Sequence, residues 1–235
     1  MRWLVLFDID GTLLSGATDA HRDAMFEALS VVHSIGPERI KPGSISPAGR
    51  TDPEIARAIL LAAGVSAERI DDRMDAVREH CCRAYARLCP PDLSEFVLPA
   101  VPELLDWLSD REDVIVGLLT GNYEAVARLK LLRAGIGGYF APGQGAFGSD
   151  AEDRLSLASI ARRRAGQLGR PHPREQTIVI GDTPRDIACA RADELRCLAV
   201  ASGPYPIEEL SDAEAAVSDA TELQQALEVE LARVA

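Results

Sequence analysis

The sequence predicts an α/β protein in which a doubly wound parallel sheet is accompanied by a small all-helical domain. Three uninterrupted apolar runs, at residues 4–7, 114–119 and 177–180, have the length and composition of strands that are buried on both faces. Between the first two runs, residues 15–98 contain helical stretches and no convincing strand. A stretch of this length is too long for a simple crossover, so we expect it to fold as a separate small domain.

Capping signals divide this helical stretch into its elements. Thr18 or Asp19 is expected to begin a first helix, and Thr51 a second, because both places offer a side-chain oxygen ahead of an apolar run. A third helix is expected over about 71–88, where two consecutive prolines end it soon afterwards. The predicted domains are residues 1–14 and 99–235 for the core and residues 15–98 for the helical domain.

Further elements are expected to complete the core. These are helices near 104–108, over 123–133, from 154 to about 168 and from about 221, and short strands near 146, over 196–199 and over 215–217. In the helix over 123–133, the spacing places Val126, Leu129 and Leu132 inward. The segment 143–148 matches the dinucleotide pattern G-x-G-x-x-G, but a run of acidic residues follows it, so we interpret it as a short strand instead.

Composition limits the classes of partner. The chain has 235 residues, of which 47% are hydrophobic, and this is enough to bury a sizeable core. Its net charge of −12 argues against a nucleic-acid partner, because no basic patch is evident to neutralise phosphates. No apolar run reaches the length of a membrane span and no signal-peptide core is evident, so we expect no membrane partner and a cytoplasmic location. Oligomeric state is not predicted.

The five cysteines lack the spacings of disulfide or zinc frameworks. Their odd number and irregular placement indicate reduced thiols in a reducing compartment. His80 precedes two adjacent cysteines, but adjacent residues of a helix point in different directions. We therefore expect these side chains to pack within a helix rather than to bind zinc.

The end of the first strand carries the strongest chemical signal. Asp8 and Asp10 follow it directly, and Gly11 allows the chain to turn away. Ligands of open α/β sheets gather at the carboxyl ends of the strands. Two neighbouring carboxylates repel each other unless a positive charge lies near them, and carboxylate oxygens are the ligands that Mg²⁺ prefers. The sequence therefore predicts a magnesium site at this edge.

The stretch Asp8-Ile9-Asp10-Gly11-Thr12-Leu13 resembles the first motif of the haloacid dehalogenase-like hydrolases. Three later stretches, in the expected order, extend this resemblance over nearly the whole chain. The resemblance implies a Rossmann-like core, with the helical domain as a cap inserted after the first motif. It also implies a magnesium-dependent phosphatase that acts through an aspartyl-phosphate.

Thr120, Gly121 and Asn122 follow the second long strand and resemble the second motif of this family. A hydroxyl followed by backbone N–H groups at a helix start predicts a phosphate cradle. The family's third motif is a lysine or, less often, an arginine near the start of a later helix. Arg154 is the best positional match, with a salt bridge to nearby acids as its alternative, and Lys130 is the rival, with a position on the helix surface as its alternative.

The segment from Gly181 to Asp186 resembles the fourth motif, G-D-x-x-x-D. The resemblance implies that Asp182 completes the magnesium site together with Asp8 and the backbone carbonyl of Asp10. Asp186 is expected to orient a metal-bound water or the third-motif cation. A helix N-cap is the alternative role for Asp182.

The expected reaction is hydrolysis of a small soluble phosphorylated metabolite. Asp8 is expected to attack phosphorus, and Asp10 to protonate the leaving alkoxide and later to take a proton from water. Arg50, in the loop before a cap helix, is expected either to bind a second anionic group, as in phosphoglycolate, or to form a helix-start salt bridge. Asp10 speaks against a dehalogenase, because halide leaves without a proton. A phosphomutase and a non-catalytic binding module remain alternatives.

Overall fold

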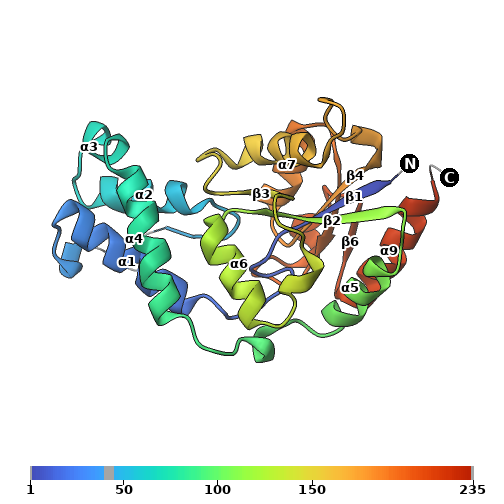
Figure 1. Ribbon diagram of the computed structural model, residues 1–235, viewed down its shortest axis with the longest axis horizontal. Coiled ribbons are helices and arrows are strands. Elements are labelled where there is room, and N and C mark those ends of the chain that lie inside the picture. The colour runs from blue at the N-terminus through green and yellow to red at the C-terminus, as the bar shows by residue number, and fades with distance from the viewer. Residues whose placement is uncertain (1, 40–44, 234–235) are drawn as a thin grey trace.

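The computed structural model describes residues 2–39 and 45–233, which contain a six-stranded parallel sheet with helices on both faces (Figure 1). The strand order is β3-β2-β1-β4-β5-β6. The strands are β1 (Trp3–Phe7), β2 (Val114–Thr120), β3 (Ala146–Phe147), β4 (Thr177–Gly181), β5 (Arg196–Val200) and β6 (Ala215–Val217). This order confirms the predicted doubly wound α/β fold, because the chain moves outward from β1 first in one direction and then in the other.

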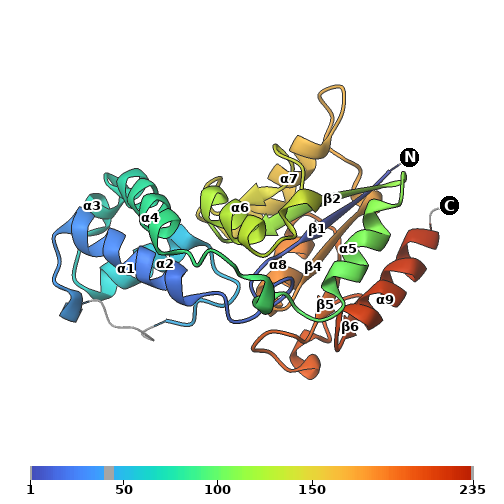
Figure 2. The ribbon, with the colours of Figure 1, turned by 60° about the horizontal axis from the view of Figure 1, so that its bottom comes forward.

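The helices divide between the cap region and the two faces of the sheet (Figures 1 and 2). Helices α5 and α9 pack together on one face, while α7 and α8 cover the other. The helices are α1 (Asp19–His33), α2 (Asp52–Ala62), α3 (Ala67–Asp71), α4 (Met74–Leu88), α5 (Val101–Ser109), α6 (Glu124–Arg133), α7 (Leu157–Ala165), α8 (Pro184–Ala192) and α9 (Ala220–Ala232). None of the helices in the described ranges has the length and hydropathy that spanning a membrane requires.

Strand β1 shows why the predicted strands are uniformly apolar. Its side chains alternate between two cores, with Val5 and Phe7 in the cluster beneath α5 and α9, and Leu4 and Leu6 in the cluster beneath α7 and α8. All five residues of the strand are buried. The strand pairs with β2 on one side and β4 on the other, so the segments that follow these three strands meet at one edge of the sheet.

The cap region has a hydrophobic cluster of its own. Helix α1 packs against α4, and the cluster includes Leu29, Leu60 and Tyr85. Tyr123 and Val126, at the start of α6, join the same cluster, so α6 connects the cap region to the sheet. In Figure 2 helices α1 to α4 lie together to one side of the sheet. The division of the chain at residues 14 and 98 stays a prediction.

Three details of the sequence prediction are wrong. The helix expected over about 71–88 begins only at Met74, and a separate short helix, α3, precedes it at Ala67–Asp71. Helix α7 ends at Ala165 rather than near Leu168, whose φ of 53° is left-handed. In α6, Leu132 is 69% exposed, because the helix turns a different face to the core, one that includes a buried lysine.

Candidate active site

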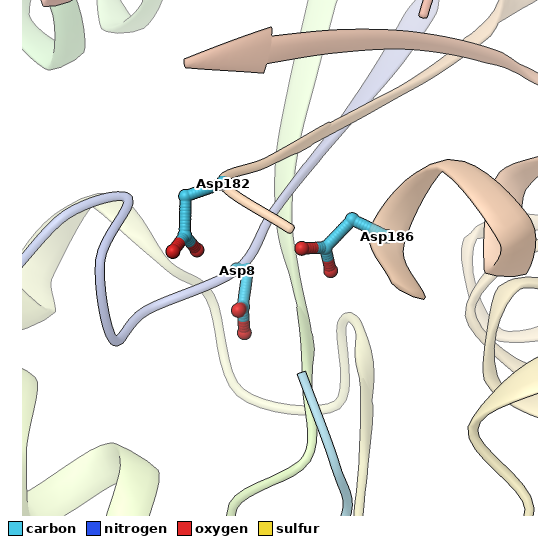
Figure 3. Close-up of side chains that lie close together, drawn as sticks. All are labelled: Asp8, Asp182 and Asp186. Carbon is cyan, nitrogen blue, oxygen red and sulfur yellow. The ribbon is translucent and has the colours of Figure 1, made fainter. Parts of the chain in front are cut away.

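Three carboxyl groups from distant parts of the chain meet at the carboxyl edge of the sheet (Figure 3). Asp8 follows β1, Asp182 follows β4, and Asp186 lies in the first turn of α8. One carboxylate oxygen from each lies within 4.8 Å of the others, and all three residues are buried. The topology brings them together because β1 and β4 are paired neighbours whose carboxyl ends point the same way.

Burial makes this cluster electrostatically unfavourable without a cation. Desolvation raises the pKa of Asp8 to about 7, and the neighbouring carboxylates of Asp186 and Asp10 add to the rise against the opposing charge of Arg154. Desolvation, reinforced by Asp186 and Asp8, raises the pKa of Asp182 to about 8. The three carboxylate oxygens form a hard donor set that suits a divalent cation such as Mg²⁺, whose charge would offset the cost of ionising Asp8 and Asp182.

Asp182 also has an oxygen that no protein group satisfies. Its Oδ1 accepts a hydrogen bond of 3.1 Å from the Thr12 hydroxyl, while its buried Oδ2 has no hydrogen-bond partner. Gly11, with φ of 93°, and Gly203 approach this carboxylate so closely that a Cβ on either would lie 2.2 and 1.7 Å from Oδ2. An unsatisfied buried carboxylate oxygen is costly, so this atom fits the role of a metal ligand. The helix that follows is capped by Thr183 instead, so the N-cap role that sequence left open for Asp182 is wrong.

Asp186 differs from the other two acids, because both of its oxygens have partners. Its Oδ2 accepts hydrogen bonds from the backbone N–H and the hydroxyl of Thr183, at 3.0 and 2.7 Å, in a capping box. Its Oδ1 accepts a hydrogen bond from Nη2 of Arg154. These contacts fit the expectation that Asp186 orients the third-motif cation.

Arg154 is buried beside the acid cluster, just ahead of α7. Besides its bond to Asp186, its Nη2 lies 3.4 Å from Oδ2 of Asp8. Desolvation acts to lower the pKa of Arg154, but the two carboxylates outweigh it and raise the pKa above its usual value. The alternative of a surface salt bridge between Arg154 and a nearby acid is wrong. Glu152 pairs with Arg57, and Asp150 pairs with Arg164 of α7.

Lys130 pairs with Asp10, the second carboxylate of the first motif. Its side chain is completely buried, and Nζ donates to both oxygens of Asp10 at 2.8 and 2.7 Å. The expectation of a helix-surface position for Lys130 is therefore wrong. Desolvation acts to raise the pKa of Asp10, but the charge and hydrogen bond of Lys130, with help from His21 and Asn122, lower it below the usual value. The side chain of Asp10 lies outside the three-carboxylate cluster.

The segment Thr120–Asn122 follows β2 at the same edge. Thr120 is buried, and its hydroxyl oxygen accepts a 3.3 Å hydrogen bond from the Asn122 backbone N–H. Asn122 donates through Nδ2 to Asp10 at 2.9 Å. Gly121 lies so close to the cap that a Cβ there would be 2.0 Å from the carbonyl oxygen of Arg50. The expected phosphate cradle thus lies beside Asp10, directly beneath the cap.

Local sequence patterns did not indicate the contacts that Asp52 and His21 make near the site. Asp52, in the first turn of α2, is buried, and its Oδ2 accepts a 2.6 Å hydrogen bond from the backbone N–H of Tyr123, just ahead of α6. His21 Nε2 lies 3.1 Å from the same oxygen. The cap therefore contributes an acid to the start of a core helix. An acid in a first helical turn is common, so its local sequence carries no sign of this long-range contact.

A cavity of about 580 Å³ lies between the sheet edge and the cap. Asp8, Asp10 and Asp182 line it, as do Arg154 and Arg50. Arg50 Nη1 donates to Glu54 one helical turn further on, and its Nε donates to a backbone carbonyl. The structure thus contains the helix-start salt bridge of the two roles expected for Arg50. The loop at 202–204 also lines the cavity, and the hydroxyl of Ser202 donates to the carbonyl of Gly11.

Fold and site together define an α/β protein with its polar groups at the carboxyl edge of a parallel sheet, beneath a helical cap. The chain belongs to the family of haloacid dehalogenase-like hydrolases, whose model matches residues 5–191. A search of curated protein sequences finds no match.

Solved structures of similar fold cover nearly the whole chain. A hydrolase from Pseudomonas syringae is 21% identical, with a TM-score of 0.63, and the match covers 97% of this chain and 98% of that one. A predicted phosphatase from Clostridium acetobutylicum is 17% identical, with a TM-score of 0.64 and coverage of 97% and 99%. A β-phosphoglucomutase from Clostridium difficile is 18% identical, with a TM-score of 0.68 and coverage of 98% and 97%. At these identities the likeness concerns the fold.

Proposed function

We propose that the protein is a magnesium-dependent phosphomonoester hydrolase that acts on a small phosphorylated metabolite through an aspartyl-phosphate. The observation that carries the proposal is the convergence of Asp8, Asp182 and Arg154 beside a second acid, Asp10, in one cavity. This set offers a nucleophile, a metal-binding group, a fixed cation and an acid–base group. Phosphoryl transfer needs each of these.

The metal site would be formed by Asp8, Asp182 and the backbone carbonyl of Asp10, with Asp186 beside it. When bound, Mg²⁺ supplies a Lewis acid that withdraws charge from the phosphoryl oxygens. Its charge would also lower the pKa of Asp8, which lies at about 7 without it. It would act against an unfavourable order, because in the metal-free protein the proposed nucleophile holds its proton more tightly than Asp10 does.

In the first step a carboxylate oxygen of Asp8 attacks phosphorus, and the bond from phosphorus to the ester oxygen breaks. The leaving alkoxide takes a proton from Asp10, whose pKa rises when the anionic phosphoryl group arrives beside it. In the second step water attacks the aspartyl-phosphate and gives a proton to Asp10. Free phosphate leaves and the Asp8 carboxylate is restored.

The remaining groups hold the transferring phosphoryl group. Arg154 is fixed by Asp186 and stands 3.4 Å from Asp8, so it is placed to meet the charge on the equatorial oxygens. Gly121 and Asn122 line the cavity on the side nearer Asp10, and the buried Thr120 supports them by accepting a hydrogen bond from the Asn122 backbone N–H. Lys130 contacts Asp10 and acts as a positioning residue for the acid–base group.

The test is hydrolysis of p-nitrophenyl phosphate with Mg²⁺ by the wild type and by Asp8→Asn. Without its nucleophile the variant is expected to lose at least about a thousandfold in kcat. Asp75→Asn is the matched control, because the side chain of Asp75 is 86% exposed on α4. Turnover by Asp8→Asn at the level of the control would refute the mechanism.

A phosphomutase of the same fold is the alternative, since three of the similar solved structures carry the name β-phosphoglucomutase. A mutase returns an isomer, whereas a hydrolase releases free phosphate, so product analysis separates the two. A non-catalytic binding module would show neither product.

The five free cysteines fit our further proposal of a reducing, cytoplasmic location.

A further inference from the structure

The cavity has two chemically different walls. The wall at the sheet edge carries the carboxylates and Arg154, as described above. The opposite wall, formed by the cap helices and the segments that lead to them, carries an apolar patch beside its polar residues. The larger side chains of this patch are Leu14, Met25, Phe26, Ile45, Ile55 and Ile59. Phe26, Ile45 and Ile55 are only partly buried, so they contact the cap's hydrophobic cluster and still present surface to the cavity.

The cations that line the cavity in the described part of the chain already face carboxylates. Arg50 donates to Glu54, and Arg154 to Asp186. His21 faces Asp52 at 3.1 Å. The fourth, Arg22, is half exposed and pairs with both Asp19 and Asp23. A second anionic group on a substrate would therefore have to compete with a carboxylate that each of these cations already faces.

We infer that the alcohol part of the substrate is uncharged and apolar, so that the site takes an alkyl or aryl phosphate rather than phosphoglycolate or a sugar phosphate. The inference rests on the proposed function. An apolar group gains free energy by leaving water for the cap wall, roughly in proportion to its area. A carboxylate or a set of hydroxyls placed against these apolar side chains loses hydration without finding partners among them. The volume of about 580 Å³ leaves room for such a group beside the phosphate.

A homologous series of substrates tests this inference directly. Ethyl, propyl and butyl phosphate have leaving alkoxides of nearly equal basicity, so differences in kcat/KM report how the alkyl chain is bound. We expect kcat/KM to rise about threefold for each methylene. We also expect propyl phosphate to exceed phosphoglycolate by at least about tenfold. A flat or falling series, or a preference for phosphoglycolate, would overturn the inference.

Substitutions in the cap wall test whether its residues cause the expected preference for longer alkyl chains. Phe26→Asn is expected to cut the ratio of kcat/KM for butyl over ethyl phosphate from about ninefold to about twofold, whereas Phe26→Leu keeps most of it. A general loss of activity cancels in this ratio. Ile55→Thr, with Ile55→Val as its control, is a second pair for the case that Phe26→Asn does not fold. An unchanged ratio in Phe26→Asn and Ile55→Thr would contradict the assignment.

Two further probes separate this inference from the proposed function. Acetyl phosphate offers little for the apolar wall to bind, so its magnesium-dependent hydrolysis reports the phosphoryl chemistry alone. Calorimetric binding of ethyl- and butylphosphonate in the presence of Mg²⁺ reports the apolar wall without any turnover. Tighter binding of butylphosphonate without hydrolysis of any ester would overturn only the hydrolase proposal. Hydrolysis of acetyl phosphate with equal phosphonate affinities would overturn only the apolar wall.

Discussion

Asp8 and Asp10 stand two positions apart after one strand, yet the fold gives them opposite surroundings. Asp8 is buried among other acids, with one arginine nearby, and burial raises its pKa to about 7. Asp10 is partly exposed and paired with a buried lysine, whose charge outweighs desolvation and lowers its pKa. Neighbouring carboxyl groups with divergent pKa values are typical of sites that divide acid–base roles, and here a bound Mg²⁺ would have to act against the order seen in the metal-free protein. Two aspartates of the same motif therefore differ in pKa because of their burial and the charged groups beside them, not because of their residue type.

Arg154 and Lys130 were rivals for one role in the sequence, and the structure gives each its own acid. The largest loss of activity among the variants that test this difference is expected from replacing Arg154, which contacts Asp8 and Asp186 of the acid cluster. Arg154→Met should lower kcat about a hundredfold or more, because no fixed cation would then meet the charge of the transition state. Arg154→Lys, which keeps a charge, should recover part of that loss. The measurement is steady-state kinetics with p-nitrophenyl phosphate, and equal kcat for wild type and Arg154→Met would contradict the role.

A smaller effect is expected from Lys130, because it acts through Asp10. Lys130→Met should lower kcat about tenfold and should shift the acidic limb of the kcat profile to higher pH. The shift follows because desolvation of Asp10 would then act without the opposing lysine charge. A purely structural role predicts a lower melting temperature with an unmoved pH profile. Measuring both quantities on the same variant decides between the two.

The smallest expected effect is a change in the thermal stability of the metal-free protein with pH, caused by Asp8 and Asp182 of the acid cluster. Asp8 and Asp182 have folded-state pKa values of about 7 and 8, above the reference value of 3.8. The folded protein therefore binds more protons than the unfolded chain between about pH 4 and pH 8, so this contribution to stability is lost as pH rises through that window.

Asp182→Asn should accordingly melt several degrees above the wild type at pH 8 in EDTA, because about 1 kcal/mol corresponds to ~2–4 °C for a chain of this size. The gap should shrink as pH falls toward 4. Adding Mg²⁺ at pH 8 should raise the melting temperature of the wild type and much less that of the variant. Thermal denaturation at the two pH values is the measurement, and a gap that widens toward acid pH would contradict the assigned pKa shifts.

Much of the fold followed from local patterns in the sequence. Unbroken apolar runs located β1, β2 and β4, because a strand covered on both faces has no polar positions. In α6 the spacing of apolar residues predicted the wrong buried face, because Leu132 is exposed and Lys130 is buried. A charged residue can occupy a buried stripe when its partner comes from elsewhere in the fold, and the partner here lies 120 positions earlier. No local pattern contains that information.

The sequence by itself determined the strands, the carboxylates that end them and the family motifs, because these depend on neighbours within a few positions. Only the tertiary structure decided which cation meets which acid, that Arg50 is engaged by Glu54, and that Asp52 of the cap reaches the start of α6. It also decided that an apolar patch of the cap faces the cavity. The physical reason is that charge pairing, desolvation and cavity shape depend on distances between residues far apart in the chain, which a one-dimensional pattern does not encode.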